Sequence, residues 1–205
     1  MPFNSAGHFI RIHEQAQKDG VMDMKAKQSK EWYRNKASNM LKMNVSRMFQ
    51  REDLQKEFPS IGRVCSFVYD AKHKDDPAKL PYWDRFPMIV PIEFNEGGFL
   101  GLNFHYLSHY YRAQFLDALY KIISDKKMDE NTRFRVTYEV LKGAKRFRAY
   151  KGCIKQYLWT QVRSPFVDIP PPEWDYALFL PLERFTGKGR SEVWFLTGKI
   201  IRGEK

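Results

Sequence analysis

The stretch that decides the fold is LPYWDRFPMIVPIEFNEGGFLGLNFHYL, residues 80–107. It contains two apolar, β-rich runs, residues 88–94 and 99–104, which are joined by the Gly-Gly loop at residues 95–98. Two such runs around a short glycine-containing loop predict a β-hairpin. Pro91 has no N–H to donate to a sheet ladder, so we expect the first strand to be an edge strand or to carry a bulge. An open edge of this kind can be completed by a strand of another subunit.

The rest of the chain predicts helices around a few further strands. Residues 61–69 have the composition of a strand. Residues 108–124 carry apolar side chains at three- and four-residue steps, which indicates one buried face of a helix that Ser108 can cap. Further helices are expected over residues 132–141 and 150–162. The sequence therefore predicts an α+β fold with a small, partly open antiparallel sheet covered by several helices.

Length and composition favour one core domain with two appendages. A chain of 205 residues can bury one core, and a hydrophobic fraction of 43% excludes wholesale disorder. Residues 1–20 mix polar groups with isolated apolar ones and predict an N-terminal arm, which either docks on a neighbour or stays mobile. Residues 21–58 set scattered Met and Trp between many cations and predict a basic helical segment. Residues 59–205 remain for the single α+β core domain.

The charge balance restricts the class of partner. Lys and Arg number 35 against 24 Asp and Glu, and the net charge of +11 implies attraction to phosphate, acidic protein or anionic lipid. No segment approaches the roughly 18 consecutive apolar residues of a membrane span, and the amino terminus lacks the pattern of a signal peptide. We therefore expect no membrane partner, and synthesis and residence in the cytoplasm. Cys65 and Cys153 have apolar neighbours, which predicts buried thiols rather than a disulfide.

The strongest candidate for a binding site is KGAKRFRAYK, residues 142–151. It interleaves cations with Phe147 and Tyr150, so it could neutralise phosphates while the rings stack or pack. The alternative is a charged connection between two helices whose aromatic rings face the core. Bound to DNA, the cations would give sequence-independent affinity that falls steeply with salt. The predicted DNA-contacting residues are Lys142, Lys145, Arg146, Arg148, Lys151 and, one helical turn further on, Lys155.

Motifs for catalysis are incomplete in this chain. The glycine-containing loop at residues 186–190 lacks the spacing of a phosphate loop and its Ser or Thr. His105 and His109 stand four apart, but Tyr106 follows the first histidine where a zinc protease has its Glu, which favours structural histidines. Three carboxylates could gather magnesium for phosphodiester cleavage, but no Glu-x-Lys nuclease pairing accompanies Glu173, Asp175 and Glu183. The sequence thus predicts no catalytic residue, no metal ligand and no cofactor.

Five stretches taken together resemble a known family. They are LPYWDRFP at residues 80–87, GGFLGLNFHYL at 97–107, Arg112 with LDAL at 116–119, YKGCIKQYL at 150–158 and EWDYALFLPLERF at 173–185. With them the chain resembles a family of small virion proteins of T-even-like contractile-tailed phages, of the DNA end protector or head-completion type. The resemblance implies a location in the virion and other virion proteins as partners, and it carries over no catalytic residue.

Three functions remain open on the sequence. A non-enzymatic structural component of the virion would contact double-stranded DNA or its end through residues 142–155 and the basic helix at 25–51. A tail, neck or baseplate subunit would instead bind only other virion proteins in a symmetric multi-subunit assembly, through residues 3–12, the aromatic surface and the sheet edge. A metal-dependent nuclease would hold magnesium at the three carboxylates. The charge favours the first function.

Overall fold

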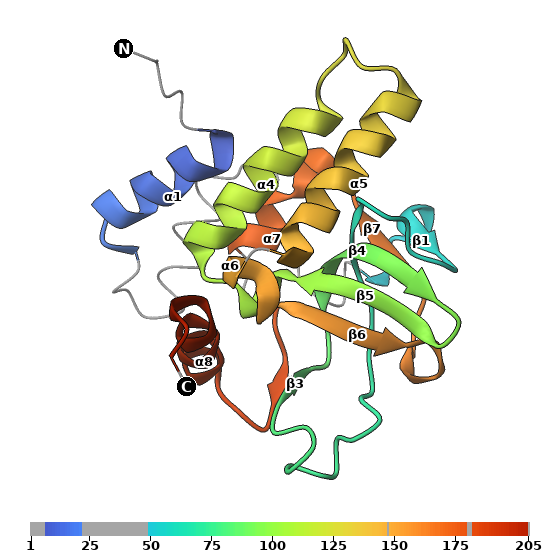
Figure 1. The fold of residues 1–205 in the computed structure, drawn as a ribbon, viewed down its shortest axis with the longest axis vertical. Coiled ribbons are helices and arrows are strands. Elements are labelled where there is room, and N and C mark those ends of the chain that lie inside the picture. The colour runs from blue at the N-terminus through green and yellow to red at the C-terminus, as the bar shows by residue number, and fades with distance from the viewer. Residues whose placement is uncertain (1–6, 22–48, 147, 180–181, 205) are drawn as a thin grey trace.

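The protein has an α+β fold in which helices cover one face of an open antiparallel sheet (Figure 1). The computed structural model describes residues 7–21, 49–146, 148–179 and 182–204. The predicted fold class is confirmed. Most of the basic helical segment expected over residues 21–58 lies outside the described residues.

Six strands form the main sheet in the order β1-β7-β2-β4-β5-β6, and all neighbours are antiparallel. Their bounds are Gln55–Lys56 for β1, Val64–Ser66 for β2, Met88–Asn95 for β4, Gly98–Asn103 for β5, Ile154–Leu158 for β6 and Phe166–Ile169 for β7. A smaller sheet pairs β3, Trp83–Asp84, with β8, Phe185–Thr186.

The predicted hairpin is confirmed as β4 and β5, and it lies inside the sheet. The register between these strands shifts between Pro91 and Glu93, which is the bulge expected from the proline. The alternative, an edge strand, is wrong because β4 also pairs with β2, through Met88 and Ile89. The pairing between β2 and β4 ends before Pro91, so the missing N–H of the proline does not interrupt that ladder.

The helices and 3₁₀ turns fill the connections between strands. The α-helices are α1 His8–Lys18, α4 His109–Ile123, α5 Glu130–Arg146, α6 Arg148–Lys151, α7 Asp175–Phe179 and α8 Arg190–Arg202. The 3₁₀ turns are η2 Glu52–Leu54, η3 Phe104–Tyr106, η4 Trp159–Gln161 and η5 Pro171–Glu173. The helix expected after Ser108 is confirmed as α4, although the Ser108 side chain makes no capping hydrogen bond. None of the described helices has the length and apolar composition needed to span a membrane.

The helix predicted over residues 150–162 is wrong, because its middle part is the edge strand β6. Its apolar residues Ile154, Tyr157 and Leu158 fit a helical face, yet the same positions pair along β5. The approach of the two strands depends on Gly98, since a Cβ built there would lie 1.9 Å from the carbonyl oxygen of Tyr157. Long-range pairing with β5 therefore overrides the local helical pattern.

The sheet separates two cores, because alternate side chains of each strand point to opposite faces. On the helical side the core includes Val90, Leu102, Phe115, Leu116 and Leu119. The opposite face carries an aromatic cluster that includes Phe67, Tyr69, Trp83, Phe99, Tyr157 and Phe166. The loop that leads to β3 contributes to this second cluster.

The N-terminal residues that the structure describes dock on their own chain. Helix α1 packs against α4 and buries Phe9, His13 and Ala16. Asp117 of α4 accepts hydrogen bonds from the backbone N–H groups of Phe9, at 3.0 Å, and Ile10, at 2.9 Å. Residues 8–18, part of the segment expected as an arm, thus form a helix that packs on α4 of the same chain.

Candidate nucleic-acid interface

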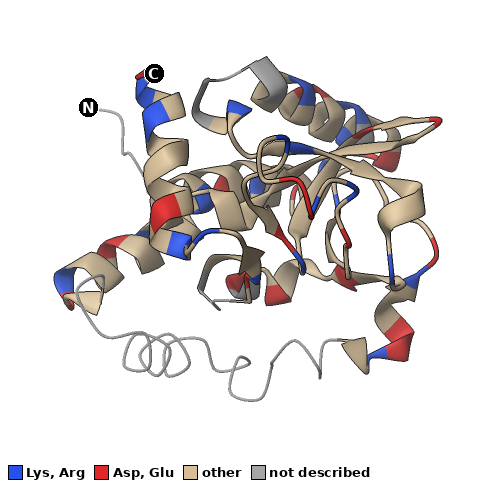
Figure 2. Cartoon of the chain, turned by 90° about the horizontal axis from the view of Figure 1, so that it is seen from below, with Lys and Arg blue, Asp and Glu red and all other residues tan. Residues whose placement is uncertain are grey.

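Positive charge is concentrated in residues 133–155, which we call the basic segment. It contains eight Lys or Arg residues and one acidic residue, Glu139, leaving 27 and 23 in the rest of the chain. The segment runs through α5, α6 and β6, and α6 contacts both α5 and α8. Elsewhere acidic and basic positions are interspersed over the ribbon (Figure 2). The basic segment therefore supplies most of the attraction that the described residues exert on phosphate.

The predicted DNA-contacting residues lie along three consecutive elements. Lys142 is exposed on α5, where its Nζ is 5.9 Å from the ring centre of Tyr138, and Lys151 is exposed on α6. Three of the predicted cations lie at the junction of α5 and α6: Lys145, Arg146 and Arg148. Of the two interleaved aromatics, Tyr150 packs 5.3 Å from Phe115 and belongs to the core, whereas Phe147 lies outside the described residues.

Lys155 lies on β6, so its predicted place one helical turn beyond Lys151 is wrong. Its Nζ is 4.2 Å from the ring centre of Tyr106, a cation–π contact. Burial lowers the pKa of Lys155, because the charged ammonium loses hydration, and the nearby Cys153 opposes this shift. Within the described part of the chain no carboxylate pairs with Lys155. It is thus a partly buried cation whose contact is an aromatic ring.

A cavity of about 320 Å³ lies beside Lys155, between β6 and the loop that leads to β3. We call it the β6 cavity. Its aromatic wall consists of Tyr69, Trp83, Tyr106 and Tyr157, and its polar lining includes Lys72, His73, Asp84, Lys155 and Gln156. Three of the five stretches that carry the family resemblance contribute to this lining, at residues 80–87, 97–107 and 150–158.

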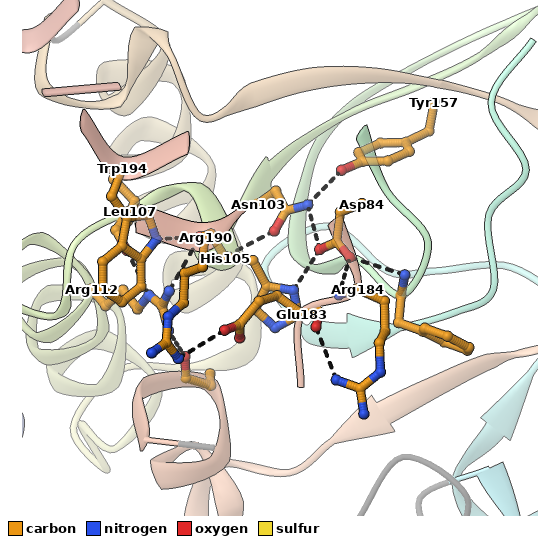
Figure 3. A network of polar contacts seen from close by, with 12 residues as sticks. Asp84, Asn103, His105, Leu107, Arg112, Tyr157, Glu183, Arg184, Arg190 and Trp194 are labelled. Carbon is orange, nitrogen blue, oxygen red and sulfur yellow. Dashed lines mark hydrogen bonds and ion pairs between the residues drawn. The ribbon is translucent and has the colours of Figure 1, made fainter. Parts of the chain in front are cut away.

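Behind the β6 cavity, Asp84 is the centre of a buried polar network (Figure 3). Its carboxylate accepts hydrogen bonds from the backbone N–H groups of Phe86, at 3.1 Å, and Arg184, at 3.0 Å, and lies 2.5 Å from His105 Nδ1. Burial alone would raise the pKa of Asp84, but the charge and hydrogen bond of His105 and the two N–H groups lower it below its usual value. Both side chains are 1% exposed, so this pair mainly holds together the elements that carry it.

The network continues to the helices through Arg112 (Figure 3). This side chain of α4 is 1% exposed, and it donates from Nε to the carbonyl oxygen of Leu107, at 2.8 Å, and from Nη2 to that of His105, at 3.3 Å. Trp194 of α8 donates to the same His105 oxygen, at 2.8 Å. Arg112, one of the residues that carry the family resemblance, therefore links η3 and Trp194 of α8 to α4.

The carboxylates considered for magnesium are not gathered into one site. Each forms an ion pair with a different residue: Glu173 with Arg51, Asp175 with His8, and Glu183 with Arg190. Among the described residues there is no group of three or more His, Cys, Asp or Glu side chains that could hold a metal ion.

Both cysteines are free and buried, as predicted. Burial raises the pKa of the Cys153 thiol to about 12, so it is protonated at neutral pH. Burial likewise raises the pKa of Cys65. Neither thiol is activated as a nucleophile.

The β6 cavity has no counterpart in the sequence-based predictions. The rings of Tyr69, Trp83 and Tyr106 come from separate parts of the chain, and no local spacing links them to Lys155. The only local signal was the composition of the basic segment, which drew attention to Lys155 for a different reason.

Comparison with known proteins connects this arrangement with one family. The family model described as "Phage T4 terminal DNA protecting protein" matches residues 9–201. A search of curated proteins and a search of solved structures each gave no match. The matched span includes the basic segment, the β6 cavity and the network around Asp84. The chain therefore belongs to the family of the phage T4 terminal DNA protecting protein.

Proposed function

We propose that this protein is a non-enzymatic component of a phage particle that binds the ends of double-stranded DNA and shields them from exonucleases. Family membership supports the DNA terminus as the target. The charge of the basic segment, which contains eight cations and one acidic residue, supports this segment as the place of the DNA contact. The proposed contact surface is formed by α5 and α6, with Lys142 and Lys151 exposed on it.

The chemistry of this surface suits a protein that must act on any sequence. Lys and Arg contacts to phosphate give affinity and orient the protein on the duplex, but they do not read bases. The helices of the basic segment thus need no base-reading side chains for the proposed role.

The test compares wild-type protein with a variant of the basic segment. Lys142, Lys145 and Lys151 are changed together to Gln, and binding to linear and closed-circular duplexes of equal length is measured across a salt series. Each lost phosphate contact should reduce the slope of log affinity against log salt by about 0.9. Exonuclease digestion of the bound linear DNA reports protection of its ends.

The matched control removes three cations elsewhere: Lys121, Lys126 and Lys127, which are exposed around the end of α4. We expect the control to keep both affinity and end protection, while the basic-segment variant loses them. An equal loss in both variants would show attraction by net charge alone. If wild-type protein neither prefers linear DNA nor protects its ends, the proposed function is wrong.

A second candidate function, a subunit that binds only other proteins of the tail, neck or baseplate, is favoured by one surface. Phe58 and Phe94 are 63% and 44% exposed, and their ring centres lie 5.9 and 6.1 Å from that of Trp159. This aromatic cluster lies near the tip of the β4–β5 hairpin, and the exposed acidic residues beside it in the chain are Glu57, Glu93 and Glu96. Exposed aromatic residues with an acidic rim suit a protein partner with basic groups, since the carboxylates repel phosphate.

One double variant distinguishes the two candidate functions. Phe58→Ser with Phe94→Ser should leave DNA affinity unchanged and reduce incorporation of the protein into particles. If particles incorporate this variant normally, the aromatic cluster is not a virion contact. If wild-type protein binds no DNA but this variant fails to be incorporated, the protein-only subunit becomes the better account.

A further inference from the structure

The β6 cavity combines features that suit an anion with an aromatic or planar part. Figure 1 shows β6 at the free edge of the main sheet, and the cavity lies between this strand and the loop that leads to β3. Its volume of about 320 Å³ is at the lower end of the range for small-ligand pockets, about 300–1,000 Å³. It can therefore take one small group, such as a single nucleotide, but not a duplex.

The charge at the β6 cavity is unbalanced toward the positive. Lys155 is partly buried in its wall, and Lys72 and His73 line it from the opposite loop. The one carboxylate in the lining, Asp84, already accepts two backbone N–H groups and contacts His105. A bound anion stabilises a buried ammonium, because it compensates for the hydration that the charged group has lost. The lowered pKa of Lys155 reflects that loss of hydration.

The aromatic wall supplies the second half of the recognition. Tyr69, Trp83 and Tyr106 line the cavity around Lys155. Nucleic-acid bases have an apolar face that packs against aromatic side chains whatever the base, which suits a site that must accept any sequence. A phosphate next to a base is thus the ligand chemistry that matches the whole lining.

A second cavity of the molecule lacks this imbalance. Its volume is about 440 Å³, and it lies between the sheet and the ends of α4 and α5. It is lined by three cations and three carboxylates: Lys56, Arg63, Arg133, Asp53, Glu130 and Asp168. The matched charges offer no net attraction to phosphate, so this cavity is the weaker candidate.

We propose that the β6 cavity receives the terminal nucleotide of a DNA strand, with its terminal phosphate at Lys155 and its base against the aromatic wall of Tyr69, Trp83 and Tyr106. This inference rests on the proposed function. It explains with one site how the protein distinguishes a DNA end from the interior of a duplex. The basic segment runs from α6 into β6, so Lys155 follows the proposed contact surface directly along the chain.

Two properties of a DNA end explain why such a site would distinguish it. A terminal phosphate monoester carries about −1.5 to −2 charges at pH 7, by analogy with phosphorylated side chains, whereas each internal phosphate carries one. A terminal nucleotide also has a stacking neighbour on one side only, so it leaves the duplex at a lower cost than an internal one. Both differences favour occupation of the cavity at an end.

The test uses full-length protein and hairpin duplexes that have one open end, which carries a 5′-phosphate, a 3′-phosphate or only hydroxyl groups. Lys155→Met removes the charge and keeps the length of the side chain, and Lys151→Met is the matched control on the exposed part of the same segment. We expect wild-type protein to prefer one phosphorylated end by about tenfold, the effect of about one charge-assisted hydrogen bond. Lys155→Met should lose that preference. Lys151→Met should weaken binding to all three duplexes equally and keep the preference for the phosphorylated end.

A second measurement does not depend on a variant that folds. A duplex with 5-iodouracil as its terminal base is photo-crosslinked to wild-type protein, and the attached peptides are identified by mass spectrometry. Crosslinks should fall in residues 69–83, 104–106 or 154–158. Crosslinks confined to other peptides, or equal affinity for phosphorylated and hydroxyl ends, would overturn the terminal-nucleotide site. In that case wild-type protein would still bind and protect linear DNA, and the proposed function would stand. If wild-type protein neither binds nor protects linear DNA, both the terminal-nucleotide site and the proposed function are wrong.

Discussion

Asp117 should control whether the N-terminal helix stays on the core. Helix α1 has Gly7 at its N-cap, and no side chain caps it locally. The carboxylate of Asp117 on α4 takes over this role, because it accepts the N–H groups of Phe9 and Ile10 at 3.0 and 2.9 Å. Changing Asp117 to Ala removes both acceptors and leaves the first turn of α1 without them.

The expected loss follows from these contacts. Removal of an N-cap side chain costs about 0.5–2 kcal/mol, and loss of a negative charge near a helix N-terminus costs about 0.3–1 kcal/mol. We therefore expect Asp117→Ala to lower the free energy of unfolding by about 2 kcal/mol. Asp117→Asn keeps one oxygen acceptor and should lose about half as much. For a domain of this size, the loss for Ala corresponds to a fall in Tm of about 4–8 °C.

Two measurements check this expectation. Urea denaturation gives the change in unfolding free energy, and limited trypsin digestion reports cleavage after the exposed Arg11 in α1. The control is Asp129→Ala, which removes the acceptor for the Thr132 N–H at the start of α5, at 2.9 Å. This control should lose about 1 kcal/mol without faster cleavage after Arg11.

Two results would contradict the capping role of Asp117. The first is a free energy of unfolding for Asp117→Ala that lies within 0.5 kcal/mol of the wild-type value, because about 0.5 kcal/mol is the smallest cost of losing a cap. The second is cleavage of wild-type protein after Arg11 as fast as cleavage of an unfolded peptide. Either result would mean that residues 8–18 do not dock on α4 in solution, and that the N-terminal part of the chain behaves as the free arm that its polar composition allows.

Three further predictions concern the core and its titratable groups. Gly98→Ala should cost about 3 kcal/mol or more in urea denaturation, because its Cβ would lie 1.9 Å from the Tyr157 oxygen, while Gly97→Ala, with 3.8 Å to its nearest neighbour, should cost far less. Burial lowers the pKa of His13 from 6.5, so the stability it contributes is present above pH 6.5 and is lost as pH falls through the folded pKa; His13→Gln should flatten this part of the curve of unfolding free energy against pH. Cys153, with its pKa near 12, should react with a thiol reagent at pH 8 only after urea unfolds the protein, and rapid reaction of the folded protein would contradict its burial.

Local patterns were enough to predict several elements of this fold. The apolar runs around the Gly-Gly loop predicted the β4–β5 hairpin, and the spacing around Phe115 predicted α4. Pro91 predicted a bulge for a local reason, because its ring removes one N–H wherever the strand lies. These features depend on side-chain periodicity and backbone chemistry, which are present in any short window of the sequence.

Long-range contacts decided the rest. Residues 154–158 fit a helix as well as a strand, and only their pairing with β5 makes them β6. That pairing places Lys155 over Tyr106, beside rings contributed by a loop more than 70 residues earlier, and so creates the β6 cavity. Likewise, Arg112 becomes a buried link because the oxygens that surround it come from η3 and α7. A local pattern reports which residues share a face of one element, but the neighbours of that face are set by loop closure and burial over the whole chain.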